Sequence, residues 1–224
     1  MVRINPSIFA ADPLNLANEL QRIASADFVH VDVMDNHFVP NMSFGANTVS
    51  RIASFSPVPL DVHLMVEDPE RWVPSFIQSN VGLITFHAEA TTAPVDLART
   101  IRESGVKAGI ALRPNTRIDG YLEHLTEFDQ IVVMTIEPGF GGQPMITTTL
   151  RKLKELRTAI DKTGKEIWLQ VDGGVNMSTI RLARECGADT FAIGSAIFQS
   201  EDPAARIAEL RASVQSADAA IDCH

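Results

Sequence analysis

The chain has 224 residues, a length typical of one large domain or two small ones, and 19 Lys and Arg against 28 Asp and Glu give it a formal net charge of −9. That acidity argues against general nucleic-acid binding and against attachment to anionic membranes, and no apolar run approaches the ~20 residues of a membrane span. Two cysteines, Cys186 and Cys223, are too few for a disulfide framework, and the first residues lack a signal-peptide pattern, so we expect a cytoplasmic protein.

Apolar runs rich in β-branched residues alternate along the chain with segments of helical periodicity. The predicted strands are Arg3–Phe9, Asp27–Asp35, Val58–Met65, Leu83–Glu89, Lys107–Arg113, Gln130–Pro138, Glu166–Val175 and Thr190–Phe198. The predicted helices are Pro13–Ser25, Asn47–Phe55, Glu70–Ser79, Ala93–Ser104, Asp119–Phe128, Thr148–Thr163, Ser178–Cys186 and Ala204–Val214. Asp-Pro pairs at 12, 68 and 202 mark helix starts, and Gly105, Gly164 and Gly187 mark helix ends.

Eight strand–helix units predict a parallel sheet, because short connections between parallel strands run through crossover helices. We therefore expect an α/β fold, a single (β/α)8 TIM barrel over residues 1–212, with a frayed tail over 213–224. The alternative is an open, doubly wound sheet, which usually has fewer strands and a glycine-rich turn after the first one. Here Ala10-Ala11-Asp12 follows the first strand, and glycines gather after strands six to eight.

Polar side chains gather where strands two, three and seven end, and a barrel of this kind carries its reactive groups at those ends. The strand ends read HVDVM at 30–34, DVHLM at 61–65 and QVD at 170–172. With a side-chain period of two, a set of two imidazoles and two carboxylates converges, which suits a divalent transition metal ion. The set is His30, Asp32, His63 and Asp172. The alternative reading is four separate buried polar groups, each satisfied by hydrogen bonds.

Methionines and glycines lie at the same strand ends. Met34, Met65 and Met134 are either core filler or a polarizable, dry wall around a charged intermediate. Glycine-rich segments lie at the ends of strands six and seven and within strand eight, at Gly139–Gly142, Gly173-Gly174 and Gly194-Ser195. Glycines let backbone N–H groups close on a phosphate, and the loops after strands seven and eight are the usual phosphate site of this barrel. An acidic chain can bind a phosphate in this way without a dedicated lysine.

The positions of the lysines argue against two chemistries. Lys107 begins a strand, at the wrong end of the barrel, and the other lysines lie on the sixth predicted helix or the loop after it. A Schiff base at the active face is therefore not expected, which disfavours a lysine-type aldolase. Barrel decarboxylases of sugar phosphates and nucleotides carry an Asp-x-Lys-x-x-Asp strand end. Aligned on Asp32, this chain has Met34 and His37 in place of the lysine and the second aspartate.

Seven motifs stand in order along the chain: Asn5–Ile8, His30–Asp35, Phe38–Asn41, Asp61–Met65, Met134–Gln143, Val171–Val175 and Gly194–Phe198. Together they resemble the ribulose-phosphate 3-epimerase family, and the likeness runs from residue 3 to about 212. The resemblance implies a (β/α)8 barrel with one divalent metal ion, a pentulose 5-phosphate substrate and a place in the pentose phosphate pathway.

The resemblance also implies roles for individual residues. The metal ligands would be His30, Asp32, His63 and Asp172, holding one divalent ion per subunit, with zinc the first choice and iron(II), manganese or cobalt the alternatives. Asp32 and Asp172 would be the catalytic acid and base. Substrate and phosphate contacts would come from Ser7, His63, Gly139, Phe140, Gly141, Gly142, Asp172, Gly173, Gly174, Gly194 and Ser195. The methionine wall would be Met34, Met65 and Met134.

The chain departs from the usual family pattern at a few positions. Asn36 stands where the family usually has glycine, and Asn5 replaces a usual alanine. Pro144 stands where the pentulose enzymes often have serine, and proline is found there in related allulose-6-phosphate epimerases. Those hexulose enzymes tend to break the glycine pair after strand seven, which is intact here, so we expect a pentulose substrate.

The predicted reaction interconverts D-ribulose 5-phosphate and D-xylulose 5-phosphate at C3 through a metal-stabilised enediolate. By analogy, Asp32 removes the C3 proton from ribulose 5-phosphate and Asp172 protonates the other face. Two other classes stay open at this point, a metal-dependent retro-aldol enzyme and a catalytically silent sugar-phosphate binder. The expected partners are a small sugar phosphate and further copies of the chain, as a dimer or hexamer, with no nucleic acid and no membrane.

Overall fold

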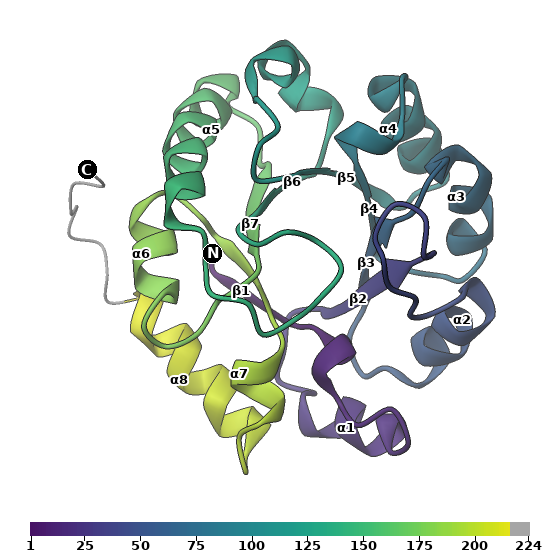
Figure 1. The fold of residues 1–224 in the computed structure, drawn as a ribbon, viewed down its shortest axis with the longest axis vertical. Helices are drawn as coiled ribbons and strands as arrows, with labels where there is room; N and C mark the ends of the chain where they lie inside the picture. Colours follow the sequence, from purple (N-terminus) through teal and green to yellow (C-terminus); the bar gives the residue numbers. More distant parts are fainter. Residues whose placement is uncertain (216–224) are drawn as a thin grey trace.

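The computed structural model describes residues 1–215. Across these residues eight strands form one sheet: β1 (Arg3–Pro6), β2 (Val29–Met34), β3 (Leu60–Met65), β4 (Leu83–His87), β5 (Lys107–Leu112), β6 (Gln130–Met134), β7 (Trp168–Asp172) and β8 (Thr190–Ile193). Each strand runs parallel to its neighbours, in the order β1-β8-β7-β6-β5-β4-β3-β2, and the sheet curls into a barrel ringed by helices (Figure 1). The predicted (β/α)8 barrel is confirmed.

The barrel closes where β1 meets β2, at the two ends of the sheet. Within the described residues this junction has one β-bridge, between Ser7 and His30, whereas the other neighbours pair along regular ladders. Asp27 adds two hydrogen bonds: its N–H donates to the Ile4 carbonyl (3.2 Å) and its Oδ2 accepts from the Ile4 N–H (2.8 Å). We call this junction the seam. It is the weakest line of pairing in the barrel.

Helices on the outside connect the strands. They are α1 (Leu16–Arg22), α2 (Ala46–Phe55), α3 (Pro69–Ile77), α4 (Pro94–Glu103), the 3-10 helix η3 (Asp119–Glu127), α5 (Leu150–Thr163), α6 (Ile180–Glu185), α7 (Ser195–Phe198) and α8 (Pro203–Gln215). Shorter 3-10 turns are η1 (Ile8–Ala10), η2 (Ala88–Ala90) and η4 (Thr147–Thr149). The predicted start of α3 at an Asp-Pro pair and the predicted end of α5 before Gly164 are both present, and Gly164 adopts φ +65°.

Several predicted boundaries differ from the observed ones, and two of the differences have a clear local cause. The first helix begins at Leu16 and not at Pro13, because Asp12 accepts the Leu14 N–H (3.0 Å) within a turn and does not cap a helix. The last strand ends at Ile193, and the apolar stretch that was expected to continue it forms the short helix α7.

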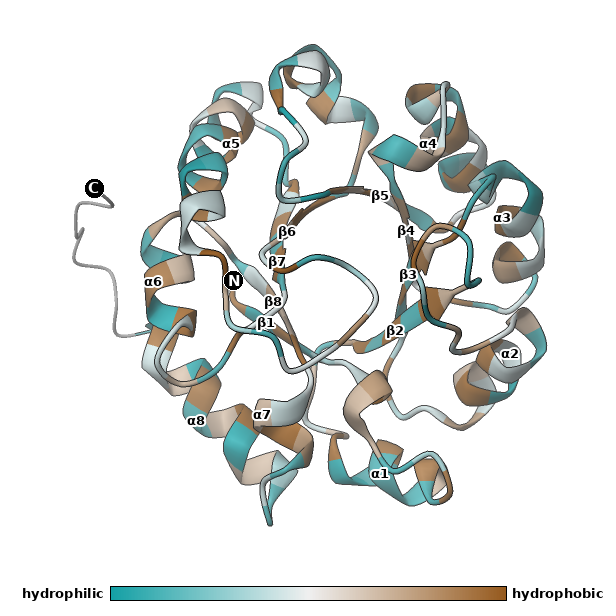
Figure 2. Cartoon of the chain, viewed as in Figure 1, coloured by the Kyte–Doolittle hydropathy of each residue, from teal (hydrophilic) through white to brown (hydrophobic). Residues whose placement is uncertain are grey.

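The main hydrophobic core lies between the strands and the outer helices. Alternate strand residues such as Val31 and Val62 are fully buried there, with Leu153 of α5 and Ile207 of α8 in the same cluster. The outer helices carry both hydrophobic and hydrophilic residues, as expected for helices covered on one side (Figure 2). The other strand positions place a buried polar set inside the barrel: Asn5, His30, Asp32, Asp61, His63, Thr85, His87, Gln130, Gln170 and Thr190.

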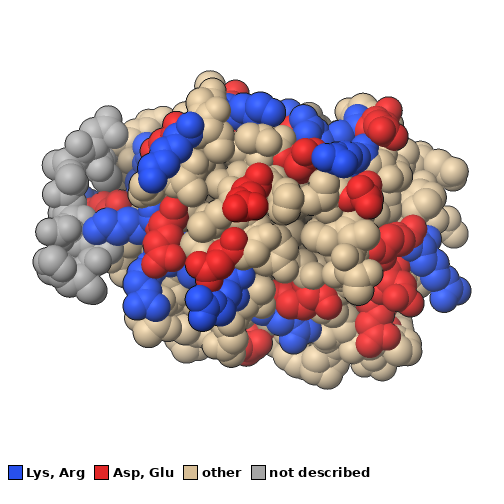
Figure 3. All heavy atoms as spheres, turned by 90° about the horizontal axis from the view of Figure 1, so that it is seen from above, with Lys and Arg blue, Asp and Glu red and all other residues tan. Residues whose placement is uncertain are grey.

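On the face seen in Figure 3, basic and acidic side chains are intermixed. Ion pairs such as Arg99–Glu127 (2.8 Å) and Arg211–Asp27 (2.6 Å) join outer elements. No helix within residues 1–215 is long and apolar enough to cross a membrane. Helix α8 extends to Gln215, so the start of the predicted tail, at 213–215, is helical. The rest of that tail, with Cys223, lies outside the described residues, while Cys186 of the described chain is buried.

Candidate active site

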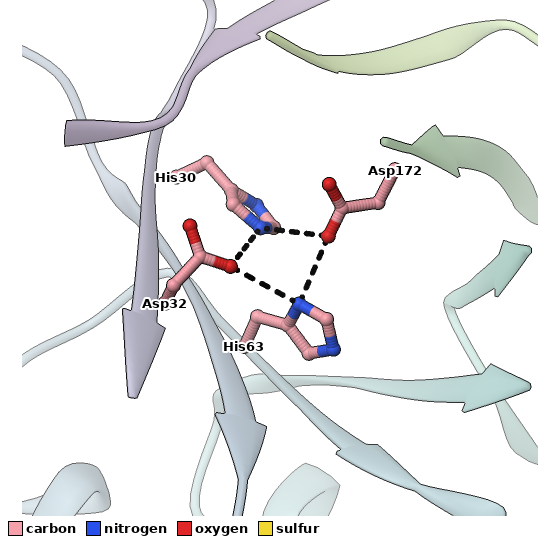
Figure 4. Close-up of side chains that lie close together, drawn as sticks. All are labelled: His30, Asp32, His63 and Asp172. Atoms are coloured by element: carbon pink, nitrogen blue, oxygen red, sulfur yellow. Dashed lines mark ion pairs between the residues drawn. The ribbon is translucent and has the colours of Figure 1, made fainter. Parts of the chain in front are cut away.

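Four side chains at the carboxyl ends of three strands point toward one another (Figure 4). His30 and Asp32 come from β2, His63 from β3 and Asp172 from β7, and one potential ligand atom of each lies within 4.8 Å of the others. The two imidazoles are fully buried, whereas the side chains of Asp32 and Asp172 are 10% and 14% exposed. The structure thus brings together the four residues of the strand-end pattern, which we call the His–Asp cluster.

The atoms that face the centre of the cluster are two nitrogens and two oxygens. His30 Nε2 lies 3.4 Å from Asp32 Oδ1 and 3.5 Å from Asp172 Oδ2. His63 Nδ1 lies 3.5 Å and 3.1 Å from the same two oxygens. Nitrogen and oxygen therefore alternate around a square, the arrangement that Figure 4 shows with dashed lines.

His30 is held from outside the cluster by Asp61, a buried residue of β3. His30 Nδ1 lies 2.8 Å from Asp61 Oδ2, so an N–H on Nδ1 donates to the carboxylate and leaves the lone pair of Nε2 facing the centre. Asp61 is held in turn by Asn5 Nδ2 (3.2 Å) and Gln130 Nε2 (3.5 Å). A buried polar network therefore lies beneath the cluster.

His63 is held from outside by His87 of β4. His63 Nε2 lies 3.0 Å from His87 Nε2, and His87 Nδ1 lies 3.1 Å from Glu89 Oε2. The planes of the two imidazoles are 21° apart and their centroids are 5.0 Å apart, so the rings meet nearly edge to edge. Each cluster histidine therefore has an outer partner on one ring nitrogen, and its other ring nitrogen points to the cluster.

The inner nitrogens give a test of whether the cluster suits a metal ion. Within the described residues, His30 Nε2 and His63 Nδ1 are buried and have no hydrogen-bond partner. A buried polar atom without a partner costs about 1–3 kcal/mol. Two imidazole lone pairs and two carboxylate oxygens form a donor set that fits a divalent transition metal, and such an ion would satisfy all four atoms. The residues present therefore fit the metal that the sequence suggested.

The pKa values of the cluster show what happens to its charges without a metal. Burial alone would lower the pKa of His30, but the charges of Asp61 and Asp32 raise it well above its usual range. Burial opposes the same rise in His63, where the nearby carboxylates of Asp172 and Asp32 bring the pKa to about 9. Burial alone would raise the pKa of Asp32 and of Asp172, but the two histidines hold both below their usual range. Asp32 and Asp172 therefore stay ionised, and their two negative charges favour a positive charge between them.

Outside the cluster, the pKa of His87 is lowered, whereas the pKa values of the two cluster histidines are raised. Burial lowers the pKa of His87 to about 4, although Glu89 opposes that shift. Burial would raise the pKa of Glu89, but hydrogen bonds from His87 and Thr116 hold it at about 2. At neutral pH this pair is therefore a neutral imidazole beside an ionised carboxylate.

A cavity of about 780 Å³ opens above the His–Asp cluster. Asp32 and Asp172 line it, while His30 and His63 do not and lie beneath. The other predicted contacts in its lining are Ser7, Gly139, Phe140, Gly141, Gly142, Gly173, Gly174, Gly194 and Ser195, together with Met34, Met65 and Met134. No lysine of the described chain contributes to this lining, in line with the argument against a Schiff base. His63, predicted both as ligand and as substrate contact, lies in the cluster and does not line the cavity.

The glycine pair after β7 has a packing reason as well as the predicted phosphate role. Gly173 and Gly174 adopt φ values of +116° and +66°. A Cβ on Gly173 would lie 2.4 Å from the Ile136 side chain, and one on Gly174 would lie 2.5 Å from the Met145 backbone nitrogen. The pair therefore lets the loop after β6 approach β7 closely. In Figure 1 that loop crosses the opening of the barrel.

Two loops meet above the cavity. Asn41 Nδ2 donates to the Gly139 carbonyl (2.7 Å), joining the loop after β2 to the loop after β6. Asn36, the departure from the usual glycine, adopts φ +61°, so the turn is kept with an asparagine that tolerates this region. Pro144, the other departure near the substrate, lines the cavity.

Sequence reasoning missed several residues that hold the site. Ser7 was predicted as a substrate contact, but its hydroxyl also donates to Asp32 Oδ2 (2.5 Å) across the seam. Ser43 Oγ donates to the Asp32 carbonyl, which fixes the end of β2. His87 and Glu89 were not singled out, although their spacing repeats the alternation that revealed the cluster on β2 and β3.

Known proteins resemble the chain both in fold and in sequence. A solved 3-keto-L-gulonate-6-phosphate decarboxylase from Vibrio cholerae superposes with a TM-score of 0.73 over 96% of this chain and 97% of its own, at 18% identity. A solved 3-hexulose-6-phosphate synthase from Salmonella typhimurium gives a TM-score of 0.69 over 96% of this chain and 99% of its own, at 16% identity. Likeness at these identities shows the barrel fold alone.

The sequence comparisons are more specific. A ribulose-phosphate 3-epimerase from Mycobacterium tuberculosis is 46% identical over 93% of this chain and 91% of its own length. The enzymes of the same name from Bacillus subtilis and Escherichia coli are 40% and 41% identical, over 95% and 94% of this chain and 100% and 95% of their own lengths. The model of the ribulose-phosphate 3 epimerase family matches residues 3–198. With the His–Asp cluster in place beneath the cavity, these matches show that the chain belongs to the ribulose-phosphate 3-epimerase family.

Proposed function

We propose that this protein interconverts D-ribulose 5-phosphate and D-xylulose 5-phosphate by inverting C3, a reaction of the pentose phosphate pathway. The observation that carries the proposal is the pair of carboxylates in the cavity. Asp32 from β2 and Asp172 from β7 both line it, and β1 and β8 lie between their strands around the barrel. Inversion needs a base on one face of C3 and an acid on the other, and two carboxylates from different sides of a cavity can supply both.

The proton transfers are assigned to these two residues. From ribulose 5-phosphate, Asp32 takes the C3 proton, and Asp172 delivers a proton to the opposite face. The reverse reaction exchanges their roles. Ser7, whose hydroxyl donates to Asp32 Oδ2, holds that carboxylate in one orientation. His30 and His63 lower the pKa of each carboxylate against the effect of burial, which keeps Asp32 ionised and able to accept the C3 proton. The proton that Asp172 delivers comes from solvent before the substrate reacts, and the proton taken up by Asp32 returns to solvent after the product leaves.

The four residues of the His–Asp cluster would hold one divalent metal ion, with zinc as the first choice because two imidazoles and two carboxylates suit its tetrahedral preference. When bound, the ion would supply Lewis-acid stabilisation of the negative charge that develops on the substrate oxygens. The outer partners Asp61 and His87 orient the two imidazoles toward that position.

The rest of the cavity suits the remainder of a sugar phosphate. The glycine-rich loops after β6, β7 and β8 all line it, and backbone N–H groups of such loops bind phosphate without a cationic side chain. Met34, Met65 and Met134, each at most 5% exposed, cover the other wall and keep water from the reacting carbon. Curated relatives that bear the pentulose name over most of this chain support ribulose 5-phosphate over a hexulose phosphate.

The experiment is an assay of the purified chain with ribulose 5-phosphate in D2O, before and after prolonged chelation. We expect xylulose 5-phosphate carrying solvent deuterium at C3, loss of turnover on chelation, and recovery with Zn2+, Mn2+, Co2+ or Fe2+. Release of a smaller carbonyl fragment would show a retro-aldol enzyme, and tight binding without turnover would show a sugar-phosphate binder. A higher kcat/KM for allulose 6-phosphate would reverse the choice of sugar.

A further inference from the structure

A short chain of hydrogen bonds leads away from the His–Asp cluster on the side opposite His30. It runs from His63 to His87 and on to Glu89, with 3.0 Å between the two Nε2 atoms and 3.1 Å between His87 Nδ1 and Glu89 Oε2. Both imidazoles are fully buried. Two nitrogens that face each other at hydrogen-bond distance need one proton between them, so one imidazole donates and the other accepts.

Glu89 sets the direction of this chain. Its Oε1 already accepts the Arg113 N–H (2.9 Å) and the Thr116 hydroxyl, which anchors the carboxylate. An ionised carboxylate can only accept hydrogen bonds, so His87 must carry its proton on Nδ1 and donate it to Oε2. A neutral His87 then has a bare Nε2, which accepts from an N–H on His63 Nε2.

The consequence reaches the cluster. With its proton on Nε2, a neutral His63 turns the lone pair of Nδ1 toward Asp32 and Asp172. If the chain ran in the opposite direction, Nδ1 would carry an N–H, which donates to Asp172 Oδ2 at 3.1 Å and cannot bind a cation. The direction of two hydrogen bonds thus decides whether His63 offers the cluster a ligand or a proton.

We propose that His87 and Glu89 are positioning residues of the metal centre, which fix the tautomer of His63 that can bind a divalent ion. This inference rests on the proposed metal site. We call the hydrogen-bonded chain from Glu89 through His87 to His63 the relay. The relay ends at Arg113 and Thr116, in the connection after β5, so residues from β3, β4, η2 and that connection hold it in place.

The test compares two substitutions at one position. Glu89→Gln keeps the shape, but the amide has a single oxygen. That oxygen is needed by the Arg113 N–H and the Thr116 hydroxyl, which leaves the NH2 group facing His87 and reverses the relay. Glu89→Ala removes the acceptor and leaves His87 free to adopt either tautomer. We expect Glu89→Gln to weaken Zn2+ binding by about 10–100-fold, the usual effect of an outer partner, and Glu89→Ala to weaken it less.

The measurement is Zn2+ affinity of the folded, metal-free chain, by competition with a chromophoric chelator at pH 7.5, with circular dichroism to verify the fold. Glu123→Gln, an exposed glutamate on η3, is the matched control and should bind as the wild type does. A second readout needs no variant: in the zinc-loaded wild type, ring-nitrogen NMR should find His63 protonated on Nε2 and His87 on Nδ1.

The outcomes separate this inference from the function it rests on. Wild-type protein that fails to bind Zn2+ would overturn the metal site and the relay together. Tight binding by the wild type with equal affinities for Glu89→Gln and Glu89→Ala would overturn the relay and leave the metal site standing. A zinc-loaded wild type with His87 protonated on Nε2 would also overturn the relay. A larger loss in Glu89→Gln, together with the expected tautomers, would support it.

Discussion

Metal binding by the His–Asp cluster should depend steeply on pH, because the ion must displace protons. Without a metal, the pKa of His63 lies at about 9 and that of His30 is also raised well above its usual range. Near neutral pH both imidazoles therefore carry a proton on the nitrogen that faces Asp32 and Asp172. A divalent ion can bind only after those protons leave.

The structure gives the magnitude for His63. Removing a proton from a group with a pKa of about 9 costs about 3 kcal/mol at pH 7, so this residue alone makes the apparent Zn2+ affinity about 50-fold lower at pH 7 than at pH 9. His30 acts in the same direction. The stability of the metal-free protein has the opposite trend. The raised pKa stabilises the fold fully below pH 6.5, and about 3 kcal/mol of that contribution is lost as the pH rises through 9.

The assay is calorimetric titration with chelator-buffered Zn2+ at several pH values, in buffers of different ionisation enthalpy. We expect one to two protons released per zinc at pH 7 and fewer at pH 9. His124→Gln, which removes an exposed histidine on η3, is the control and should release the same number. Affinity that is constant from pH 6 to pH 8, with no proton release, would refute the reasoning.

Three further outcomes follow from the site and the core. Asp172→Asn, with metal content verified, should lower epimerisation by about 10²–10⁴-fold while solvent deuterium still exchanges into ribulose 5-phosphate through Asp32; near wild-type epimerisation would contradict the two-carboxylate scheme. Gly174→Ala should raise KM and lower unfolding stability more than Gly142→Ala, since both have positive φ but only the first meets backbone within 3 Å; equal effects in thermal unfolding would show that loop packing is unimportant. Phe76→Ala should lower unfolding stability by about 3–5 kcal/mol in denaturant titration, because Phe76 is 1% exposed under α3, and a smaller loss would show a core that collapses around the gap.

The strands were predictable because each is a short apolar run of β-branched residues, and all eight lie where the pattern indicated. Their ends were less predictable. The run over Thr190–Phe198 is apolar throughout, and hydrophobicity alone does not separate a buried strand from a short buried helix, so the turn at Gly194 was not foreseen. Likewise, a proline after Asp12 suggested a helix start, but the local turn at Asp12 delays the helix to Leu16.

The cluster was predictable for a related reason: its four members stand at strand ends, where alternation fixes which side chains share a face. Its supports were not. Gln130 of β6 and Asn5 of β1 contact Asp61 of β3 across the interior of the barrel. Which side chains meet there depends on the stagger of the closed sheet, and the sequence of a single strand does not determine that stagger. His87 ends β4 and Glu89 lies in the turn η2 that follows, and neither had an evident partner until β3 was placed beside β4.

A sugar phosphate bound across the seam between β1 and β2 should stabilise the barrel at this junction. Ser7 lies at the end of β1, Asp32 lies on β2, and Gly194 follows β8, the neighbour of β1 on the other side. A sugar phosphate bound between Asp32 and the loop at Gly194 would cross this seam, where residues 1–215 form one β-bridge and no ladder. Binding of the sugar phosphate should therefore slow amide hydrogen exchange along β1 and β2 more than along β4 and β5, because a regular hydrogen-bonded ladder already joins β4 to β5.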